Sequence, residues 1–265
     1  IHPRGGVYQG PVNVTVTLDH PEQQSARYTV DGSQPTMDSP KLEPSLKTTG
    51  SQTILARTFD QGGQASRVVS AEFIIDSNLL PFTGDNWYIW DAPGANPTES
   101  SWSFKGGVAS QTSNIYVNTK ETMSKNPAIH RPGTLRILQP ENSKAMANGE
   151  ISFEINSSDN DGVGFAFRVQ DKDNYYLWTM HKERSFHSLA RMKGGRYELL
   201  AENQRSYRSG QWHQVKIELA GSQITIYFDG EKELQVSDSI FPQGGIALYS
   251  WGNSGVQWRA LEMVK

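Results

Sequence analysis

Short runs of alternating apolar and polar residues recur along the whole chain, and turns rich in glycine and aspartate separate them. The runs at 224–228 and 233–236, for example, flank an Asp229-Gly230 pair. A period of two is typical of half-buried strands, and Asp-Gly is a two-residue hairpin signal. No stretch shows the period of a helix longer than a turn or two. The pattern therefore predicts an all-β protein.

The first 76 residues predict a small sandwich of short strands. Four alternating runs, at 12–18, 26–30, 52–59 and 66–75, are separated by turn residues. Short strands at this spacing are typical of immunoglobulin-like sandwiches. A polar, proline-ended stretch at 76–81 then marks a boundary. We therefore expect one domain over residues 1–77 and a second, larger β domain over residues 78–265.

The first domain resembles a known family. The residues that carry the resemblance are Gly5-Gly6-Val7-Tyr8, the string YTVDGSQPT at 28–36, and Ile54-Leu55-Ala56-Arg57. They resemble the chitobiase C-terminal-type domain, an immunoglobulin-like or fibronectin-like module. The resemblance implies a spacer inside a secreted polysaccharide-degrading enzyme, with no catalytic residues of its own.

The second domain resembles another superfamily. Its closing part, SGQWHQVKIELAGSQITIYFDG at 209–230 and GGIALYSWGN at 244–253, is similar to the concanavalin A-like, laminin-G-type jelly roll. The segments SWSFKGGVASQTSNIY at 101–116 and SSDNDGVGFAFRVQDKDNYYLW at 157–178 resemble its opening and central strands. The resemblance implies a large two-sheet sandwich of the kind found in bacterial sugar-binding modules. One fold of this kind hosts many specificities, so it does not name the ligand.

Two acidic turns mark the segment Ser157–His187. Asp159 and Asp161 lie on the first turn, and Asp173 lies on the second. Carboxylate oxygens are the ligands that calcium prefers, and one turn cannot supply the six to eight that it takes. Acidic residues also favour turns without any metal. We therefore expect either plain turns or a structural calcium ion held by these three residues with help from other loops.

Alternation also predicts a sugar-binding face. Val163, Phe165, Phe167 and Val169 are expected to face inward, which leaves Gly164, Ala166 and Arg168 to form a shallow floor on the other face. Near the end of the chain, Ile246 and Leu248 are expected inward and Tyr249 and Trp251 on the opposite side. Aromatic rings and planar donors are the usual partners of a sugar. The predicted site consists of Trp178, His181, Arg184, Arg191, Tyr249, Trp251 and Asn253.

The same strands lack the catalytic signature of the concanavalin A-like glucanases. Concanavalin A-like glucanases carry an E-x-D-x-x-E strand, and this sequence contains none. Glu150 and Glu154 share a strand face by parity, but four residues of strand separate them by roughly 13 Å. Cleavage of a glycosidic bond needs a closer pair of carboxyl groups. The sequence therefore favours binding over catalysis.

Composition limits the partners and the compartment. The formal net charge is −3, so nothing indicates a nucleic-acid surface. No apolar run approaches the roughly 18 residues of a membrane span. Cysteine is absent, which is compatible with bacterial export. The chain begins at Ile1-His2-Pro3 without a signal peptide, as expected of a piece of a longer polypeptide.

Together these observations predict a non-catalytic region of a larger secreted or cell-surface bacterial enzyme. It would bind a polysaccharide or oligosaccharide and hold a catalytic domain of the same polypeptide near it. Two alternatives remain at this stage. One is an adhesion or spacer module that contacts protein, and the other is an unrecognised polysaccharide hydrolase or lyase.

Overall fold

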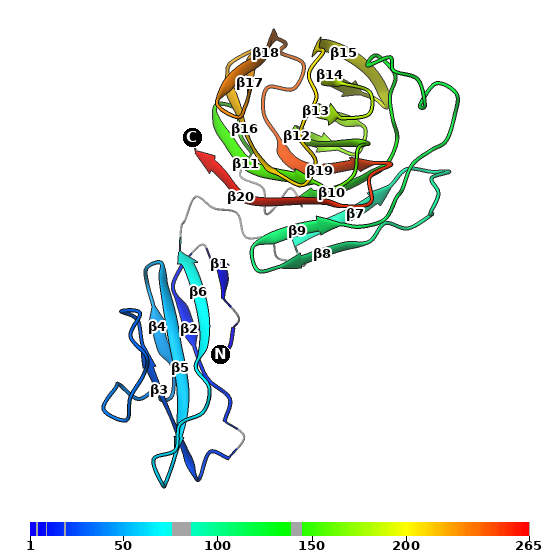
Figure 1. Ribbon diagram of the computed structural model, residues 1–265. Coiled ribbons are helices and arrows are strands. Elements are labelled where there is room, and N and C mark those ends of the chain that lie inside the picture. Colours follow the sequence, from blue (N-terminus) through cyan, green and yellow to red (C-terminus); the bar gives the residue numbers. More distant parts are fainter. Residues whose placement is uncertain (4, 9, 19, 76–85, 139–144, 265) are drawn as a thin grey trace. The chain divides into compact units, whose positions relative to one another are not determined.

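The computed structural model describes residues 1–265 except residues 4, 9, 19, 76–85, 139–144 and 265. The chain divides into two compact units, the first formed chiefly by residues 1–81 and the second chiefly by residues 82–265 (Figure 1). The predicted boundary after residue 77 lies outside the described residues. In the described part, no helix has the length and apolar character needed to cross a membrane.

The first unit is a small β-sandwich. One sheet has the strand order β1-β6-β5-β3, and β2 pairs with β4 beside it. The sandwich closes over a small core of Val12, Val14, Ile54, Ala71 and Phe73. The strand predicted at 12–18 is shorter than expected, since regular pairing ends at Val14. The bounds are β1 (Gly6–Tyr8), β2 (Val12–Val14), β3 (Gln24–Thr29), β4 (Leu46–Thr48), β5 (Gln52–Asp60) and β6 (Val69–Ile75).

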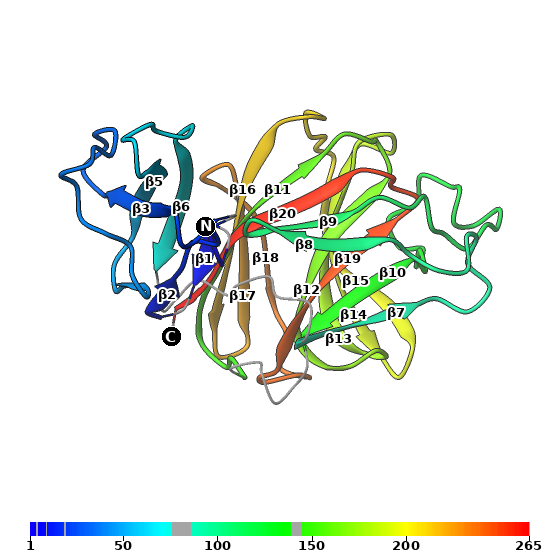
Figure 2. The ribbon, with the colours of Figure 1, turned by 90° about the horizontal axis from the view of Figure 1, so that it is seen from below.

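The second unit is a jelly-roll sandwich of two seven-stranded sheets, as predicted (Figure 2). We name the sheets after their central strands. In order across the β12 sheet lie β15 (Arg196–Asn203), β14 (Phe186–Lys193), β13 (Asn174–His181), β12 (Gly162–Asp171), β19 (Gly245–Trp251), β10 (Thr134–Leu138) and β7 (Trp87–Asp91). In order across the β11 sheet lie β18 (Glu231–Ser237), β17 (Gln223–Phe228), β16 (Trp212–Ala220), β11 (Gly149–Ser157), β20 (Val256–Val264), β9 (Val108–Gln111) and β8 (Trp102–Lys105).

Aromatic side chains fill the space between the two sheets. Phe153 on β11 stacks on Phe165 on β12 with ring centroids 4.4 Å apart. Trp178 on β13 lies 6.1 Å from Phe228 on β17, again across the sandwich. All four side chains are buried. The inward direction predicted for Phe165 from alternation is therefore confirmed.

A bulge on β12 changes the alternation after Phe167. The pairing register shifts between Phe167 and Val169, and Arg168 takes a positive φ of 47°. Val169 therefore packs in the cluster on the outer face, not inward as predicted. Arg168 does not line a floor, because its buried guanidinium donates to the carbonyls of Phe241, Ala147 and Gly221. Strict alternation fails at a bulge because one extra residue reverses the parity.

Candidate functional site

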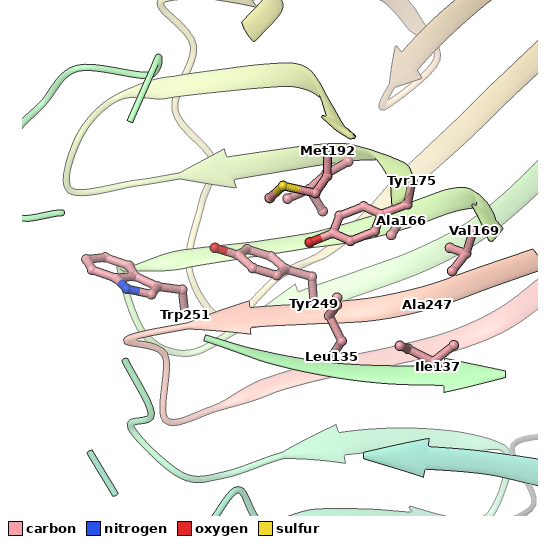
Figure 3. Packing of buried hydrophobic residues seen from close by; sticks show 10 residues of the cluster. Leu135, Ile137, Ala166, Val169, Tyr175, Met192, Ala247, Tyr249 and Trp251 are labelled. Carbon is pink, nitrogen blue, oxygen red and sulfur yellow. The ribbon is translucent and has the colours of Figure 1, made fainter. Parts of the chain in front are cut away.

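The outer face of the β12 sheet carries a row of aromatic and apolar side chains (Figure 3). As alternation predicted, Ala166, Tyr249 and Trp251 lie on this face. Each of them is 3% exposed or less. The face is therefore a second hydrophobic layer and not an open platform. Its buried members are Leu135, Ile137, Ala166, Val169, Tyr175, Leu177, Met192, Ala247, Tyr249 and Trp251.

The segment between β9 and β10, residues 112–133, covers part of this layer, and we call it the covering segment. Arg131 fixes its shape, since its guanidinium donates to four backbone carbonyls within the segment. The acceptors are Thr122, Ser124, Asn126 and Ile129, at 2.7–3.1 Å. The same guanidinium lies over the rings of Phe186 and Trp251, with its central carbon 5.3 and 5.8 Å from the ring centroids. The Tyr249 hydroxyl donates to the Arg131 carbonyl at 2.5 Å.

These contacts change the interpretation of the predicted aromatic site. Tyr249 was expected to face ligand, but its ring is buried and its hydroxyl anchors the covering segment. Trp251 was expected to stack on sugar, but the Arg184 guanidinium already lies over its ring at 4.8 Å. Asn253 is fully buried, and its side-chain amide bonds the Ser157 hydroxyl at 2.9 Å. Strand parity gave the correct side of the sheet for Tyr249 and Trp251, but an open sugar-binding face there is wrong, because parity gives the side of a sheet and not what covers it. Asn253, predicted on the loop that follows, is buried as well.

Two other predicted residues lie on the inner side of the sandwich. The Trp178 indole is buried between the sheets and donates to Glu233 at 2.8 Å. The Arg191 guanidinium pairs with Asp238, which follows β18 of the opposite sheet, and with Glu198 at 2.7 Å. Neither side chain reaches the face that carries Trp251. Grouping them with that face is therefore wrong, because they have the opposite parity on β13 and β14.

An open hollow remains at the edge of the covering segment, and we call it the rim hollow. Its volume is about 300 Å³, and its wall includes both open and buried side chains. Arg184 lines this hollow, and its side chain is almost fully buried. The Arg184 Nη1 atom donates to Asp161 at 2.6 Å and to Glu183 at 2.9 Å, and Nε donates to the Ser124 carbonyl at 3.2 Å. The residues that line the hollow are Asn114, Tyr116, Met123, Asp161, Glu183, Arg184, Trp251 and Gly252.

Local sequence explains why Arg184 and the two carboxylates meet. Asp161 ends the turn before β12, and Glu183 and Arg184 lie on the turn after β13. These strands pair antiparallel with Gly162 opposite His181, so both turns come to one edge of the sheet. A Cβ atom at position 162 would lie 2.3 Å from the His181 ring. Only glycine at position 162 leaves room for that ring.

The rim hollow combines a fixed cation with two carboxylates of different environments. Burial raises the pKa of Asp161, although its ion pair with Arg184 acts in the opposite direction. Glu183 is more open, with half of its side chain exposed. His181 is buried beneath them, and burial together with Arg131 and Arg184 lowers its pKa well below the usual value. His181 is therefore neutral, and it contacts Trp251 with ring centroids 6.1 Å apart.

The predicted acidic residues do not form one metal site. Asp159 and Asp161 lie at one end of β12, whereas Asp173 lies in the turn at the other end. The Asp159 carboxylate accepts from the backbone and hydroxyl of Ser254, both at 2.8 Å, and Asp161 is paired with Arg184. Among the residues that the structure describes, no three His, Cys, Asp or Glu side chains are grouped as metal ligands would be. Asp159, Asp161 and Asp173 therefore do not hold one calcium ion together, because they lie at opposite ends of β12.

Sequence reasoning missed part of the rim hollow. Tyr116 and Asn114 belong to the covering segment, which shows no strand period, and Asp161 was assigned to metal. Tyr116 is half-buried and meets Trp251 edge-on, with centroids 6.0 Å apart. The arrangement therefore offers a partly open aromatic ring, an amide, two carboxylates and a guanidinium around one space. These are the groups that recognise sugar hydroxyls and the apolar face of a sugar ring.

Comparison with known families divides the chain in the same way. Residues 3–70 match the profile of the chitobiase/beta-hexosaminidase C-terminal domain. Residues 94–264 match the profile of the 3-keto-alpha-glucoside-1,2-lyase-like domain. A comparison with curated protein sequences found no match.

Solved structures resemble this chain at low sequence identity. The carbohydrate-binding module CBM66 of Bacillus subtilis is 15% identical, with a TM-score of 0.52, over 68% of this chain and 96% of that chain. A beta-glucanase of Bacillus licheniformis is 10% identical, with a TM-score of 0.47, over 71% of this chain and 96% of that chain. A putative glycosyl hydrolase of Parabacteroides distasonis is 14% identical, with a TM-score of 0.42, over 68% of this chain and the whole of that chain. At this identity the first likeness shows the fold alone.

Proposed function

The chain belongs, through residues 94–264, to the family of 3-keto-alpha-glucoside-1,2-lyase-like domains, and we propose that its second unit binds a polysaccharide at the rim hollow without cleaving it. The observation that carries the proposal is the convergence of Tyr116, Asn114, Asp161, Glu183 and Arg184 around one open space. The fold shared with a carbohydrate-binding module fits the same role.

The geometry favours recognition of a single sugar unit. Hydroxyl groups both donate and accept, so they suit a wall where carboxylates accept and a guanidinium and an amide donate. Tyr116 offers the apolar contact that a pyranose or furanose face needs. Arg184 is itself held by Ser124, Asp161 and Glu183, so it is pre-organised for a ligand and loses little side-chain freedom on binding.

The position of Arg184 also supports the proposal of binding without cleavage. Its Nη1 atom lies between the two carboxylates of the hollow and bonds both. A guanidinium in that place acts to lower the pKa of the Asp161 carboxyl group, whereas glycoside cleavage needs a carboxyl group that holds a proton as the general acid. We infer that the pair binds hydroxyls and does not perform acid–base chemistry.

One observation favours a second candidate function, a glycoside-cleaving enzyme. Because Asp161 and Glu183 bond the same nitrogen at 2.6 and 2.9 Å, their two oxygens are at most about 5.5 Å apart. Burial raises the pKa of Asp161 beside the more open Glu183. Two close carboxyl groups in unlike environments are the pattern of a retaining glycosidase. Turnover distinguishes this candidate from binding.

A glycan array with the whole chain tests the proposal. We expect binding to at least one neutral polysaccharide, weakened about tenfold by Glu183→Gln and by Tyr116→Leu, since each removes one contact worth about 1.4 kcal/mol. The matched control is Glu198→Gln, which removes an equally exposed carboxylate that also pairs with an arginine, Arg191, outside the hollow. Trp251 and Tyr249 are unsuitable positions because both are buried.

Three results would overturn the proposal. An equal loss of affinity in Glu183→Gln and Glu198→Gln would show that the glycan does not bind at the rim hollow. Absence of binding to every glycan, with capture of a protein partner, would support the adhesion or spacer alternative. Release of reducing ends or of an unsaturated sugar, abolished by Asp161→Asn, would make the chain an enzyme. Repeating the array with EDTA tests calcium, which stays a prediction for the chain as a whole.

The first unit gives this binding role a context. We propose that it acts as a spacer, and that both units belong to a larger secreted or cell-surface bacterial enzyme. A tethered binding unit raises the effective concentration of a catalytic domain at the polysaccharide without any new contact. Comparing the full-length protein with and without residues 1–265 on insoluble polysaccharide tests this, with soluble substrate as the control. Equal rates on the insoluble polysaccharide would contradict the targeting role.

A further inference from the structure

A hollow of about 470 Å³ lies on the opposite side of the sandwich, on the outer face of the β11 sheet. The pairing register explains its position. Ser152 on β11 lies opposite Lys216 on one side and opposite Glu262 on the other, so a small side chain is flanked by two long ones. Lys216 in turn lies opposite Tyr227 on β17. The hollow therefore has Ser152 at its floor and longer side chains as walls.

A bulge in β20 shapes one wall of this hollow. The register shifts between the Ser152 and Glu154 pairings, and Ala260 takes a positive φ of 50°. This backbone region favours glycine, so Ala260 marks a local irregularity of the strand. Bulges direct neighbouring side chains away from regular alternation. Here the bulge leaves Glu262 and Arg259 on the same outer face, with Ala260 lining the hollow.

The charged groups around the hollow are partly paired and thereby fixed. Lys216 pairs with Glu218 at 2.5 Å and lies over the Tyr227 ring, with Nζ 4.4 Å from the centroid. The Tyr227 hydroxyl donates to the other Glu218 oxygen at 3.0 Å. Glu154 pairs with Arg259 at 2.5 Å. Two walls of the hollow are therefore held in place by ion pairs before any ligand arrives.

Other polar groups of the hollow have no protein partner. Among the described residues, nothing bonds the Glu262 carboxylate, the Ser152 hydroxyl or the side-chain amide of Gln214. All three line the hollow. The hollow thus presents an unused acceptor, an unused hydroxyl and an unused amide beside a lysine and one tyrosine ring.

We propose that this hollow is a second sugar-binding site, which takes one neutral unit of a saccharide. A neutral polyhydroxyl ligand fits because carboxylates and a lysine line the same space. Glu262 and Glu154 would repel an anionic ligand, and Lys216 would repel a cationic one. Sugar hydroxyls satisfy both kinds of group, and Tyr227 offers an apolar ring edge. The inference rests on the proposed function only in assuming that the chain meets polysaccharide.

Two sites on opposite faces would make the second unit bivalent. Each site alone binds weakly, because an open polar surface buries few anchors. Engagement of both sites by neighbouring chains of an insoluble polysaccharide raises the overall affinity through effective concentration. A soluble oligosaccharide of four to six units, in contrast, reports each site separately.

NMR titration of the whole ¹⁵N-labelled chain tests the proposal. The probes are cello-, laminari-, xylo-, manno- and fructo-oligosaccharides of four to six units, with oligogalacturonate and chitosan oligomers as charged comparators. We expect at least one neutral probe to shift backbone amides around Ser152, Lys216 and Tyr227. Glu262→Gln, which keeps the shape and removes the charge, should weaken these shifts at least fivefold. Ser152→Gln, which fills the floor, should abolish them.

The matched control is Glu231→Gln, an exposed carboxylate on β18 that pairs with Arg205 away from the hollow and should leave all shifts unchanged. The amides around Asp161 and Glu183 report the rim hollow independently. Shifts there without shifts around Ser152 would overturn the second site and keep the proposed function. Shifts around Ser152 alone would support the second site and overturn the proposed function of the rim hollow. No shift with any neutral probe, or larger shifts with a charged comparator, would also overturn the second site.

Discussion

The two outer faces of the second unit are built alike but differ in how far their aromatic side chains are buried. Each is one face of a seven-stranded sheet, and each carries aromatic side chains. On the β12 sheet these rings lie beneath the covering segment, and Tyr249 and Trp251 are buried. On the β11 sheet the corresponding face is open, and Trp212 and Tyr227 are partly exposed. Whether a sheet face is buried or exposed therefore depends on whether another segment of the chain packs on it.

The cations on the two faces show why the outcomes differ. Arg131 lies against Trp251 and uses its N–H groups on carbonyls of the covering segment. Arg259 lies over Trp212 at 4.0 Å but uses its guanidinium on Glu154, whose side chain is only partly buried. A guanidinium that satisfies the carbonyls of a loop allows that loop to pack on apolar surface without unpaired polar groups. A guanidinium that pairs with a carboxylate on the surface, in contrast, holds no loop over the sheet.

Replacement of Arg131 by methionine should have the largest effect. Four carbonyls of the covering segment lose their donor, and unmet buried acceptors are costly, so we expect the free energy of unfolding to fall by about 4 kcal/mol. All seven tryptophans lie between residues 87 and 258, so tryptophan fluorescence in urea follows the second unit. The control is Arg259→Met on the open face, which should cost about 1 kcal/mol or less. Similar losses in both variants would remove the distinction between the faces.

The second-largest effect should come from acid, which we expect to weaken the packing of the covering segment on the β12 sheet. Burial and the neighbouring Arg131 lower the pKa of His130 on the covering segment from 6.5 to about 4. His130 stacks on Tyr197 of β15, and the charged group that acts on its pKa is the Arg131 guanidinium. Because the pKa of His130 is lower in the folded state, the unfolded state binds more protons than the folded state between pH 6.5 and about pH 4. Stability is therefore complete above pH 6.5 and is lost as the pH falls toward 4, by at most about 3 kcal/mol.

Hydrogen exchange measures this effect on the covering segment itself. Amides of residues 112–133 should exchange faster at pH 5 than at pH 7 after correction for the intrinsic rate, while amides of the β11 sheet should not. His130→Phe keeps the ring stack on Tyr197 and should remove much of the acid effect. Buried His181 has a pKa lowered in the same direction and accounts for a remainder. An unchanged acid response in His130→Phe would show that another group controls the segment.

Much of this architecture follows from the sequence, and the reason is periodicity. Alternation gave the all-β class, the inward side of Phe165 and the outer side of Tyr249. It failed at Arg168 because a bulge adds one residue, and no local signal in the sequence marks that bulge. The two-domain division came from resemblance and turn composition, and family profiles match both parts.

The candidate site was harder to predict, because its key contacts join distant segments. The covering segment has no strand period, so nothing indicated that Tyr116 and Asn114 would reach Asp161 or that Arg131 would seal the aromatic row. Arg184 was predicted as a planar donor to sugar hydroxyls, and the structure places it at the edge of the sheet where the turns before β12 and after β13 meet. Burial by a loop depends on contacts more than 100 residues apart in the chain, such as Tyr249 with Arg131.

The smallest effect concerns one hydroxyl on each face. Tyr249→Phe removes the hydrogen bond to the Arg131 carbonyl and leaves that buried acceptor unpaired, which should lower the free energy of unfolding by about 1 kcal/mol. Tyr227→Phe removes a hydrogen bond to Glu218 on the open face, where water replaces it, so we expect almost no change. Urea unfolding followed by tryptophan fluorescence compares the two variants directly. If Tyr227→Phe cost as much as Tyr249→Phe, the open face would be as tightly sealed as the covered one, and the contrast between them would fail.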